Sequence, residues 1–138
     1  MTRVFVIAEI GSSAAPAWDF DAWCAAAAAV GADGVKAQMF KAEHFPLAEQ
    51  DSKRPLEFPR ARLREFVMCA HAYGLRAGVS VFDAEAAALA GEWCDFVKLA
   101  AREQDNHALA NVVFVAGLDR RTPVYRSISK FSELPAEQ

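Results

Sequence analysis

The sequence predicts an α/β protein with about five parallel strands and four intervening helices. Short β-branched or apolar runs alternate along the chain with longer stretches that are rich in alanine or show helical periodicity. Glycine, proline and polar residues separate these stretches, as expected where strands and helices end. The chain has 138 residues, of which 54% are hydrophobic and 24% charged, so residues 1–138 are expected to form a single globular domain.

The elements of the first half follow from residue type and spacing. Val4–Ile10 is a β-branched apolar run and is expected to be a strand. An alanine-rich helix is expected over Trp18–Val30, and a second strand over Gly34–Phe40. Residues 41–59 carry three prolines and many polar side chains. They are expected to be a polar loop, either a lid over a site or, as we favour, a solvated loop.

The same alternation continues in the second half of the chain. Apolar residues recur at helical spacing from Leu63 to Ala70, and Asp83 is suited to cap the helix that follows it. Residues 130–138 are expected to be a C-terminal tail. The expected elements are, in order, the helix Arg60–Tyr73, the strand Arg76–Phe82, the helix Ala84–Gly91, the strand Asp95–Ala100, the helix His107–Gly117 and the strand Thr122–Ser129.

Strict alternation of strands and helices implies a parallel sheet with right-handed crossovers. Two architectures fit this pattern, an open doubly wound sheet and a partial TIM-type (β/α) barrel. A complete (β/α)8 barrel needs about 200 residues or more, so this chain cannot form one alone. An open sheet exposes the edges of its first and last strands, which predicts a homodimer or a partner chain that supplies the missing strands.

Composition excludes several classes of protein. A net charge of −3 argues against a general nucleic-acid binder, and no run reaches the roughly 18 apolar residues that a membrane helix needs. The N-terminus lacks a signal-peptide pattern, so the expected location is the cytoplasm. Cys24, Cys69 and Cys94 show no metal-binding spacing and are expected to be inert buried thiols.

Polar residues gather where the predicted strands end. In parallel α/β folds these ends face the ligand, and lysines with hydroxyls there suit a phosphate or carboxylate. The alternative is that such lysines simply emerge into solvent. A lysine buried at such a position needs a partner, which Glu9 could be. The residues at or just beyond the strand ends are Glu9, Lys36, Gln38, Ser80, Lys98, Glu103, Arg126, Ser127 and Ser129.

An ordered set of motifs resembles the sialic acid synthase (N-acetylneuraminate synthase) family. The motifs are "AEIG", "GADGVKAQMFKAE", "VFD" and "FVKLA" followed by "DN", and the resemblance covers about Val4 to Ser129. It implies the first half of a (β/α)8 barrel. It also implies condensation of phosphoenolpyruvate with an N-acyl amino sugar in its aldehyde form, with a divalent metal, usually manganese.

The resemblance assigns roles by position. Glu9 matches a glutamate near the reacting centre, and Glu103 an acidic position associated with the sugar. Lys36 and Lys98 match lysines that hold the phosphoenolpyruvate anion. Asn106 matches an asparagine that opens the next helix.

Three further residues complete the substrate-binding set that the resemblance implies. Gln38 matches the glutamine after the first lysine, and Ser80 stands where the family usually has threonine. Ser127 falls near a serine that contacts phosphate.

The sequence also departs from the family pattern. The family continues "AEIG" with an Asn-His-x-Gly loop, whereas residues 12–15 here read "SSAA". After Lys98 the family has a small residue, a serine and a glycine, whereas this chain has Ala100, Ala101 and Arg102. Arg102 could either replace a phosphate contact or fill the pocket.

The histidines do not match metal-ligand positions. His44, His71 and His107 lack paired spacing and are expected on the surface or packed against helices, so no metal or other cofactor is expected in this chain. The isolated chain is therefore expected to be an incomplete or inactive synthase. The alternatives are a non-catalytic half-barrel that binds an anion or sugar phosphate, and a Schiff-base enzyme that uses Lys98.

Overall fold

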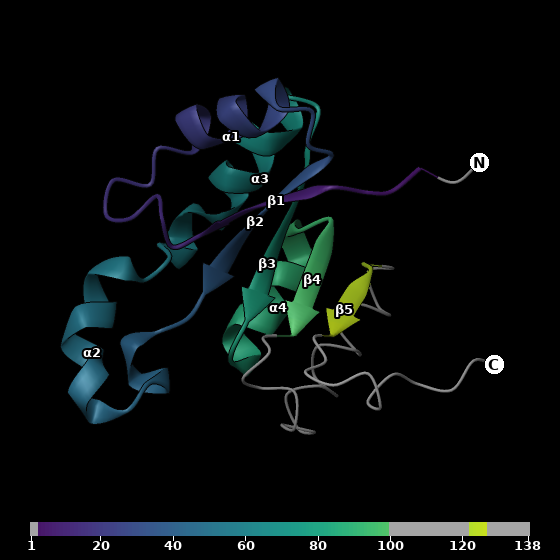
Figure 1. Cartoon of the computed structure of the whole chain (residues 1–138). Coiled ribbons are helices and arrows are strands. Elements are labelled where there is room, and N and C mark those ends of the chain that lie inside the picture. The colour runs from purple at the N-terminus through teal and green to yellow at the C-terminus, as the bar shows by residue number, and fades with distance from the viewer. Residues whose placement is uncertain (1–2, 100–121, 127–138) are drawn as a thin grey trace.

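A computed structural model of the chain describes residues 3–99 and 122–126. Its centre is one parallel sheet with the strand order β1-β2-β3-β4-β5 (Figure 1). The fifth predicted strand is confirmed in its central residues. The strands are β1 (Ile7–Gly11), β2 (Gly34–Met39), β3 (Arg76–Val81), β4 (Phe96–Leu99) and β5 (Val124–Arg126).

Three helices form one layer against this sheet. They are α1 (Phe20–Ala29), α3 (Leu63–Ala72) and α4 (Ala84–Trp93), and all three were predicted from the sequence. Each packs against the strands beside it, and α3 contacts both α1 and α4. Asp19 and Asp83 cap α1 and α4, because their carboxylates accept hydrogen bonds from the backbone N–H of Ala22 and Ala86.

Strand alternation divides the sheet into a helix-covered face and an inner face. Val35, Val79 and Val81 point toward the helices and are fully buried in the hydrophobic core. The residues between them point the other way, because successive side chains of a strand alternate in direction. The polar strand residues, Lys36 and Ser80 among them, therefore share the inner face.

The first strand is shorter than predicted. Val4 and Val6 are 76% and 52% exposed, and β1 begins at Ile7. Pairing begins there because Ile7 is the residue that lies opposite Gly34, the first residue of β2. Val6 still binds the sheet through its carbonyl, which accepts hydrogen bonds from Asp33 and Gly34.

The prediction of a loop over residues 41–59 was wrong, because this segment contains the helix α2 (Leu47–Lys53). Short 3-10 turns flank the helix at Ala42–His44 and Arg54–Leu56, and a further one at Arg60–Arg62 leads into α3. Pro46 is the N-cap that precedes α2, and the alanine, glutamate, glutamine and lysine of the helix favour the helical conformation. None of its residues is buried, so the apolar periodicity by which sequence patterns reveal helices is missing.

Several predictions fall outside the described residues. They concern the helix over His107–Gly117, the tail at 130–138 and the ends of the fourth and fifth strands. Within residues 3–99 and 122–126, no helix has the length and apolar character needed to cross a membrane.

Candidate anion-binding site

The register of the sheet brings the predicted strand-end residues together. Glu9 of β1 lies opposite Lys36 of β2. Gln38 lies opposite Ser80 of β3, which in turn lies opposite Lys98 of β4. Residues opposite each other in a parallel sheet point to the same face, so all five side chains reach one end of the inner face.

A local irregularity of β1 follows directly after its charged residue, Glu9. The register between β1 and β2 shifts between Glu9 and Gly11, which marks a bulge. Gly11 has a φ of +60°, a conformation that a residue with a side chain adopts with strain. A Cβ built at Gly11 would make only ordinary contacts, 3.7 Å from Glu9 Oε1 and 3.8 Å from Gln38 Oε1, so the positive φ rather than a lack of space favours glycine here. The glycine therefore lets the chain turn away beside these two side chains.

Lys36 is the buried centre of the site. Lys36 is only 6% exposed to solvent, and its ammonium has two partners within the protein. Nζ lies 2.8 Å from Glu9 Oε2, and it donates a hydrogen bond of 2.5 Å to Ser80 Oγ. A buried charge is tolerated when it is paired and hydrogen-bonded, so Glu9 is the partner that the sequence led us to expect.

The environment lowers the pKa of Lys36. Burial removes the ammonium from water and is the largest cause, while the hydrogen bond and charge of Glu9 act in the opposite direction. The positive charge of Lys98 lowers the pKa of Lys36 further. A second anion beside these two lysines would relieve both unfavourable effects, because it would compensate the desolvated charge and the repulsion.

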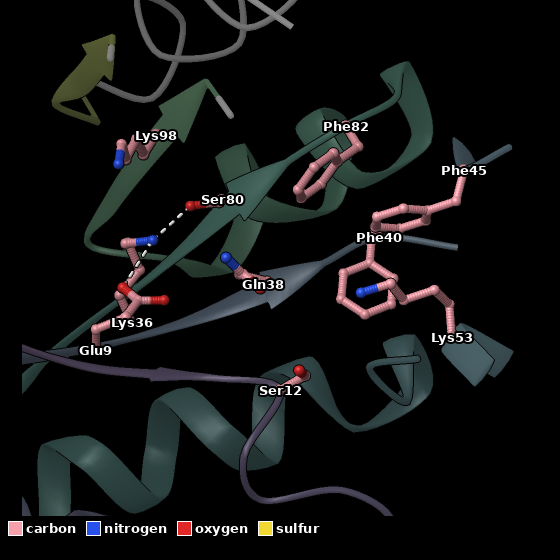
Figure 2. Close-up of a pocket in the computed structure, with 10 residues that line it drawn as sticks. All are labelled: Glu9, Ser12, Lys36, Gln38, Phe40, Phe45, Lys53, Ser80, Phe82 and Lys98. Carbon is pink, nitrogen blue, oxygen red and sulfur yellow. Dashed lines mark hydrogen bonds and ion pairs between the residues drawn. The ribbon is translucent and has the colours of Figure 1, made fainter. Parts of the chain in front are cut away.

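These residues line a cavity of about 490 Å³ (Figure 2). Lys36 and Lys98 approach it from neighbouring parts of the inner face, and Gln38 points into its middle. All five predicted residues of the described part of the chain belong to its lining. The complete lining is Glu9, Ser12, Lys36, Gln38, Phe40, Phe45, Lys53, Ser80, Phe82 and Lys98.

Sequence reasoning missed the aromatic end of this cavity. Phe40 and Phe82 continue β2 and β3 two residues beyond Gln38 and Ser80, so strand alternation could have assigned them to the same face. Phe45, by contrast, comes from the segment that was expected to be a solvated loop. The ring of Phe40 meets those of Phe45 and Phe82 edge to face, at centroid distances of 5.1 and 6.0 Å.

A polar cluster supports this aromatic end from outside the cavity. Both oxygens of Asp83 accept hydrogen bonds from Arg60, at 3.0 and 2.7 Å, and His44 Nε2 lies 3.1 Å from Asp83 Oδ2. The His44 ring stacks on Phe82, and its Nδ1 accepts a hydrogen bond from the Lys41 backbone. The cluster therefore ties the turn after β2 to the start of α4.

The two histidines in the described part of the chain form ion pairs and are not grouped as metal ligands. His44 and His71 each pair with an aspartate, Asp83 and Asp95 respectively. Within residues 3–99 and 122–126, no three His, Cys, Asp or Glu side chains are grouped to hold a metal ion. The described residues thus offer no fit for the metal that the resembling family uses.

The thiols are suited to packing rather than nucleophilic chemistry. Cys24 and Cys94 are buried, and burial raises the pKa of each thiol to about 12. Cys69 is partly buried, and burial is also the main cause that raises its pKa. Thiolates are the reactive form of cysteine, so these pKa values disfavour reactivity.

Five of the seven predicted site residues lie together in the described part of the chain. The other two, Glu103 and Ser127, lie outside the described residues, as do Arg102, Asn106, His107 and Ser129. The backbone of Arg126 belongs to β5.

Comparison with known proteins identifies the fold of the chain through similar solved structures. No family model and no curated protein matches the chain. Among solved structures, the chain is similar to N-acetylneuraminic acid (sialic acid) synthetase from Leptospira borgpetersenii serovar Hardjo-bovis, determined in complex with citrate. The TM-score is 0.71 and the identity 17%, over 94% of this chain and 56% of that one.

Two synthase structures from Thermotoga maritima are also similar. One is a truncated form of 3-deoxy-D-arabino-heptulosonate 7-phosphate synthase, with a TM-score of 0.60 and 13% identity over 88% of this chain and 39% of that one. The other is phospho-2-dehydro-3-deoxyheptonate aldolase (DAHP synthase), with a TM-score of 0.62 and 14% identity over 88% of this chain and 32% of that one. The chain thus has the α/β fold of part of a TIM-type barrel and spans about half or less of each of these structures.

Proposed function

We propose that the cavity binds a small anion that resembles phosphoenolpyruvate, with the ligand's phosphate or carboxylate at Lys36 and Lys98. The observation that carries this proposal is a buried lysine of β2 that shares one cavity with a second lysine of β4, on the same face of the parallel sheet and toward its carboxyl edge. That is the edge at which barrel enzymes bind their ligands. Lysine ammonium groups bind phosphate as point charges, without the forked geometry of arginine.

The neighbouring residues take supporting roles in this proposal. Glu9 holds the Lys36 ammonium in place, since the two lie 2.8 Å apart. Ser80 accepts a hydrogen bond from Lys36, so its own hydroxyl hydrogen is available to donate to an anion. The Gln38 side chain lines the cavity and offers an amide donor and a carbonyl acceptor.

We further propose that this site serves a carbon–carbon bond-forming transferase of the sialic acid synthase type. In that reaction phosphoenolpyruvate condenses with an N-acyl amino sugar in carbohydrate biosynthesis. The motifs of the sequence and the fold shared with a sialic acid synthetase support this function. The chain spans 56% of that structure, so the reaction also requires residues beyond those of the matched region, from a partner chain or a longer polypeptide.

A non-catalytic binding protein is the second candidate. The observation that favours it is the segment after β1, where the resembling family carries an asparagine and a histidine. Here Ser12 and Ser13 stand at these two positions, and Ser12 lines the cavity. Neither side chain supplies an amide or imidazole to a reacting centre, although the anion could still bind.

Calorimetric titration with phosphoenolpyruvate tests the binding site. Lys36→Gln and Lys98→Gln are each expected to weaken binding at least about tenfold, the scale of one charge-assisted hydrogen bond. Arg76→Gln is the matched control, because Arg76 is a cation at the opposite end of β3 and lines a different cavity. Binding that is absent from the unmodified chain, or unchanged by both lysine variants, would overturn the proposed site.

A further inference from the structure

Lys36 combines the features of a lysine that acts as a nucleophile. It is buried, it lines the cavity, and a carboxylate lies beside its amine. An ammonium group must lose a proton before it can attack another atom, and desolvation or a second cation nearby favours that loss. Burial and the charge of Lys98 both act on Lys36 in this direction. The proposed anion site uses only the charged form of Lys36, so the neutral amine has no role in it.

The partners of Lys36 fix its amine and leave one direction free. Nζ lies 2.8 Å from Glu9 Oε2 and 2.5 Å from Ser80 Oγ, and Figure 2 shows it between these two side chains. A neutral amine has two N–H hydrogens, which these two oxygens can accept, and its lone pair takes the remaining direction. The amine is thus held in place while its lone pair stays available for a carbonyl carbon.

A second lysine on the same face indicates which carbonyl compounds fit. Lys98 lies opposite Ser80, so both side chains point to the inner face, and both line the cavity. Within the described ranges, no acidic side chain lies within ion-pair distance of Lys98. A ligand with a carboxylate next to its carbonyl would pair with Lys98 while its carbonyl carbon meets Lys36. The cavity of about 490 Å³ has room for such a small acid.

We propose that Lys36 forms an imine with a small 2-oxo acid such as pyruvate, with the acid's carboxylate at Lys98 and Glu9 as the proton carrier. This inference goes beyond the proposed function, because phosphoenolpyruvate has no free carbonyl group and cannot form an imine. It also assigns Schiff-base chemistry to Lys36, whereas the sequence suggested Lys98. The reason is that Lys36 has a carboxylate within hydrogen-bond reach, and Lys98 has none in the described part of the chain.

The steps of imine formation balance without an oxidant or a reductant. Glu9 takes a proton from the Lys36 ammonium, and the neutral amine attacks the carbonyl carbon. As the C–N bond forms, the carbonyl π electrons move to oxygen, which takes a proton from nitrogen. Glu9 then gives its proton to this hydroxyl group, the C–O bond breaks, and water leaves as the nitrogen lone pair completes the C=N bond. The products are water and an iminium ion whose charge pairs with the Glu9 carboxylate.

The iminium ion defines the class of reaction that follows. It acidifies the C–H bonds next to the C=N carbon, because the electron pair of a broken C–H bond can form a C=C bond while the C=N electrons move to nitrogen. Glu9 or water takes the released proton. The resulting enamine can take a proton back from solvent or attack an electrophilic carbon. The class is therefore proton exchange and carbon–carbon bond formation next to a carbonyl group.

Borohydride trapping with pyruvate tests the imine. Sodium borohydride reduces the C=N bond irreversibly, and peptide mapping by mass spectrometry identifies the lysine that carries the adduct. We expect one adduct on Lys36 of the unmodified chain and its loss in Lys36→Met. Lys41→Gln is the matched control, because it removes a lysine outside the cavity lining and should leave the adduct unchanged. No adduct in the unmodified chain, or an adduct mainly on another lysine such as Lys98, would overturn the inference.

Substitution of Glu9 tests the proton carrier. Glu9 raises the pKa of Lys36, so its removal lowers that pKa further and leaves more of the amine neutral. If Glu9 only held the lysine, Glu9→Gln would be trapped faster than the unmodified chain. As a proton carrier, its loss is expected to slow trapping at least about a hundredfold, and Glu9→Asp, which keeps a carboxylate, should recover part of the rate. Trapping of Glu9→Gln at an unchanged or higher rate would refute this role.

Calorimetric titration with phosphoenolpyruvate separates this inference from the proposed function. If phosphoenolpyruvate binds and pyruvate leaves no adduct, the imine is wrong while the anion site stands. If Lys36 is trapped and phosphoenolpyruvate does not bind, the imine stands without the proposed function. If both hold, phosphoenolpyruvate should protect Lys36 from trapping, because the two acids compete for Lys98. Failure of both experiments overturns both proposals.

Discussion

Glu9 and Lys36 form an ion pair in which the two charges are unequally buried. The Lys36 side chain is 8% exposed, whereas that of Glu9 is 45% exposed. Removal of the carboxylate would leave a buried ammonium with only Ser80 as a partner. Removal of the ammonium would leave a carboxylate that water can solvate. The pair is thus asymmetric, and its two members have different consequences for stability.

This asymmetry predicts opposite effects of two single substitutions. Glu9→Gln is expected to lower the free energy of unfolding by about 1–3 kcal/mol, because it leaves Lys36 buried without its counter-ion. Lys36→Met is expected to keep or raise stability while it removes anion binding, since an apolar side chain fills the same space. Urea denaturation measures both changes. Equal losses of stability in the two variants would contradict this account of the pair.

The lowered pKa of Lys36 also predicts proton uptake on ligand binding. An anion beside Lys36 favours its charged form and raises its pKa again, so binding takes up protons at a pH between the two pKa values. Calorimetry with phosphoenolpyruvate in two buffers of different ionisation enthalpy measures this uptake. Above about pH 8 the phosphate itself is already fully ionised, given a second pKa of about 6. No proton uptake is expected in Lys36→Gln, and equal uptake in both proteins would assign the effect elsewhere.

Gly78 lies opposite Lys36 in the sheet and leaves space for an aromatic ring beneath the site. A Cβ built at Gly78 would lie 2.2 Å from a ring carbon of Phe96, closer than any real contact. Gly78→Ala is therefore expected to displace Phe96 and lower the free energy of unfolding by about 1–3 kcal/mol. Thermal or urea denaturation gives the measurement. The double variant with Phe96→Leu should recover part of the loss, and no recovery would mean that the clash is not the cause.

At the scale of elements, Asp83 connects three parts of the chain. It caps α4, accepts two hydrogen bonds from Arg60 and pairs with His44. Burial alone would raise the pKa of Asp83, but the hydrogen bonds from Arg60 and from the Ala86 backbone outweigh it and lower the pKa. The folded protein therefore holds Asp83 ionised more strongly than the unfolded chain does. Its contribution to stability is present above pH 3.8 and is lost as the pH falls through the lowered pKa.

Asp83→Asn is expected to flatten this acid dependence. The amide oxygen can still cap α4, but it carries no charge for Arg60, so stability near neutral pH falls by about 1–3 kcal/mol. Denaturation curves between neutral pH and acid measure both effects. A variant that loses stability in acid as steeply as the unmodified chain would show that Asp83 does not dominate this range.

The elements that pack on the sheet could be predicted from the sequence, and α2 could not. α3 places Leu63, Phe66 and Val67 in the core, so the spacing of its apolar residues predicts a helix with one buried face. α2 buries no residue and therefore lacks that signal. The same contrast holds in the site. The positions of Glu9 and Lys36 on predicted strands identified them as site residues. Lys53 lies on α2, which was not predicted, and only the tertiary structure shows that it lines the cavity.

At the scale of the whole molecule, the inner face of the sheet carries a layer of aromatic side chains in addition to the residues that line the cavity at Lys36. Phe96 packs edge to face with Phe5 and Tyr125, at centroid distances of 6.4 and 6.0 Å. Phe5 is 44% exposed and Tyr125 is 49% exposed, and both line a cavity of about 620 Å³. In a closed barrel such inward-facing side chains form packed layers. Within the described ranges, this layer lies on the face away from α1, α3 and α4.

The open sheet and this aromatic layer predict association with another chain. In the described residues β1 and β5 are the two ends of the strand order, so each pairs on one side only. We expect a homodimer, or a complex with a chain that supplies further strands, with Phe5 and Tyr125 buried at the interface.

Light scattering coupled to size-exclusion chromatography measures the mass in solution. Tyr125→Lys is expected to shift the chain toward a monomer, whereas Val30→Lys, at an 80% exposed position after α1, should not. A strict monomer at all concentrations of the unmodified chain would contradict the homodimer.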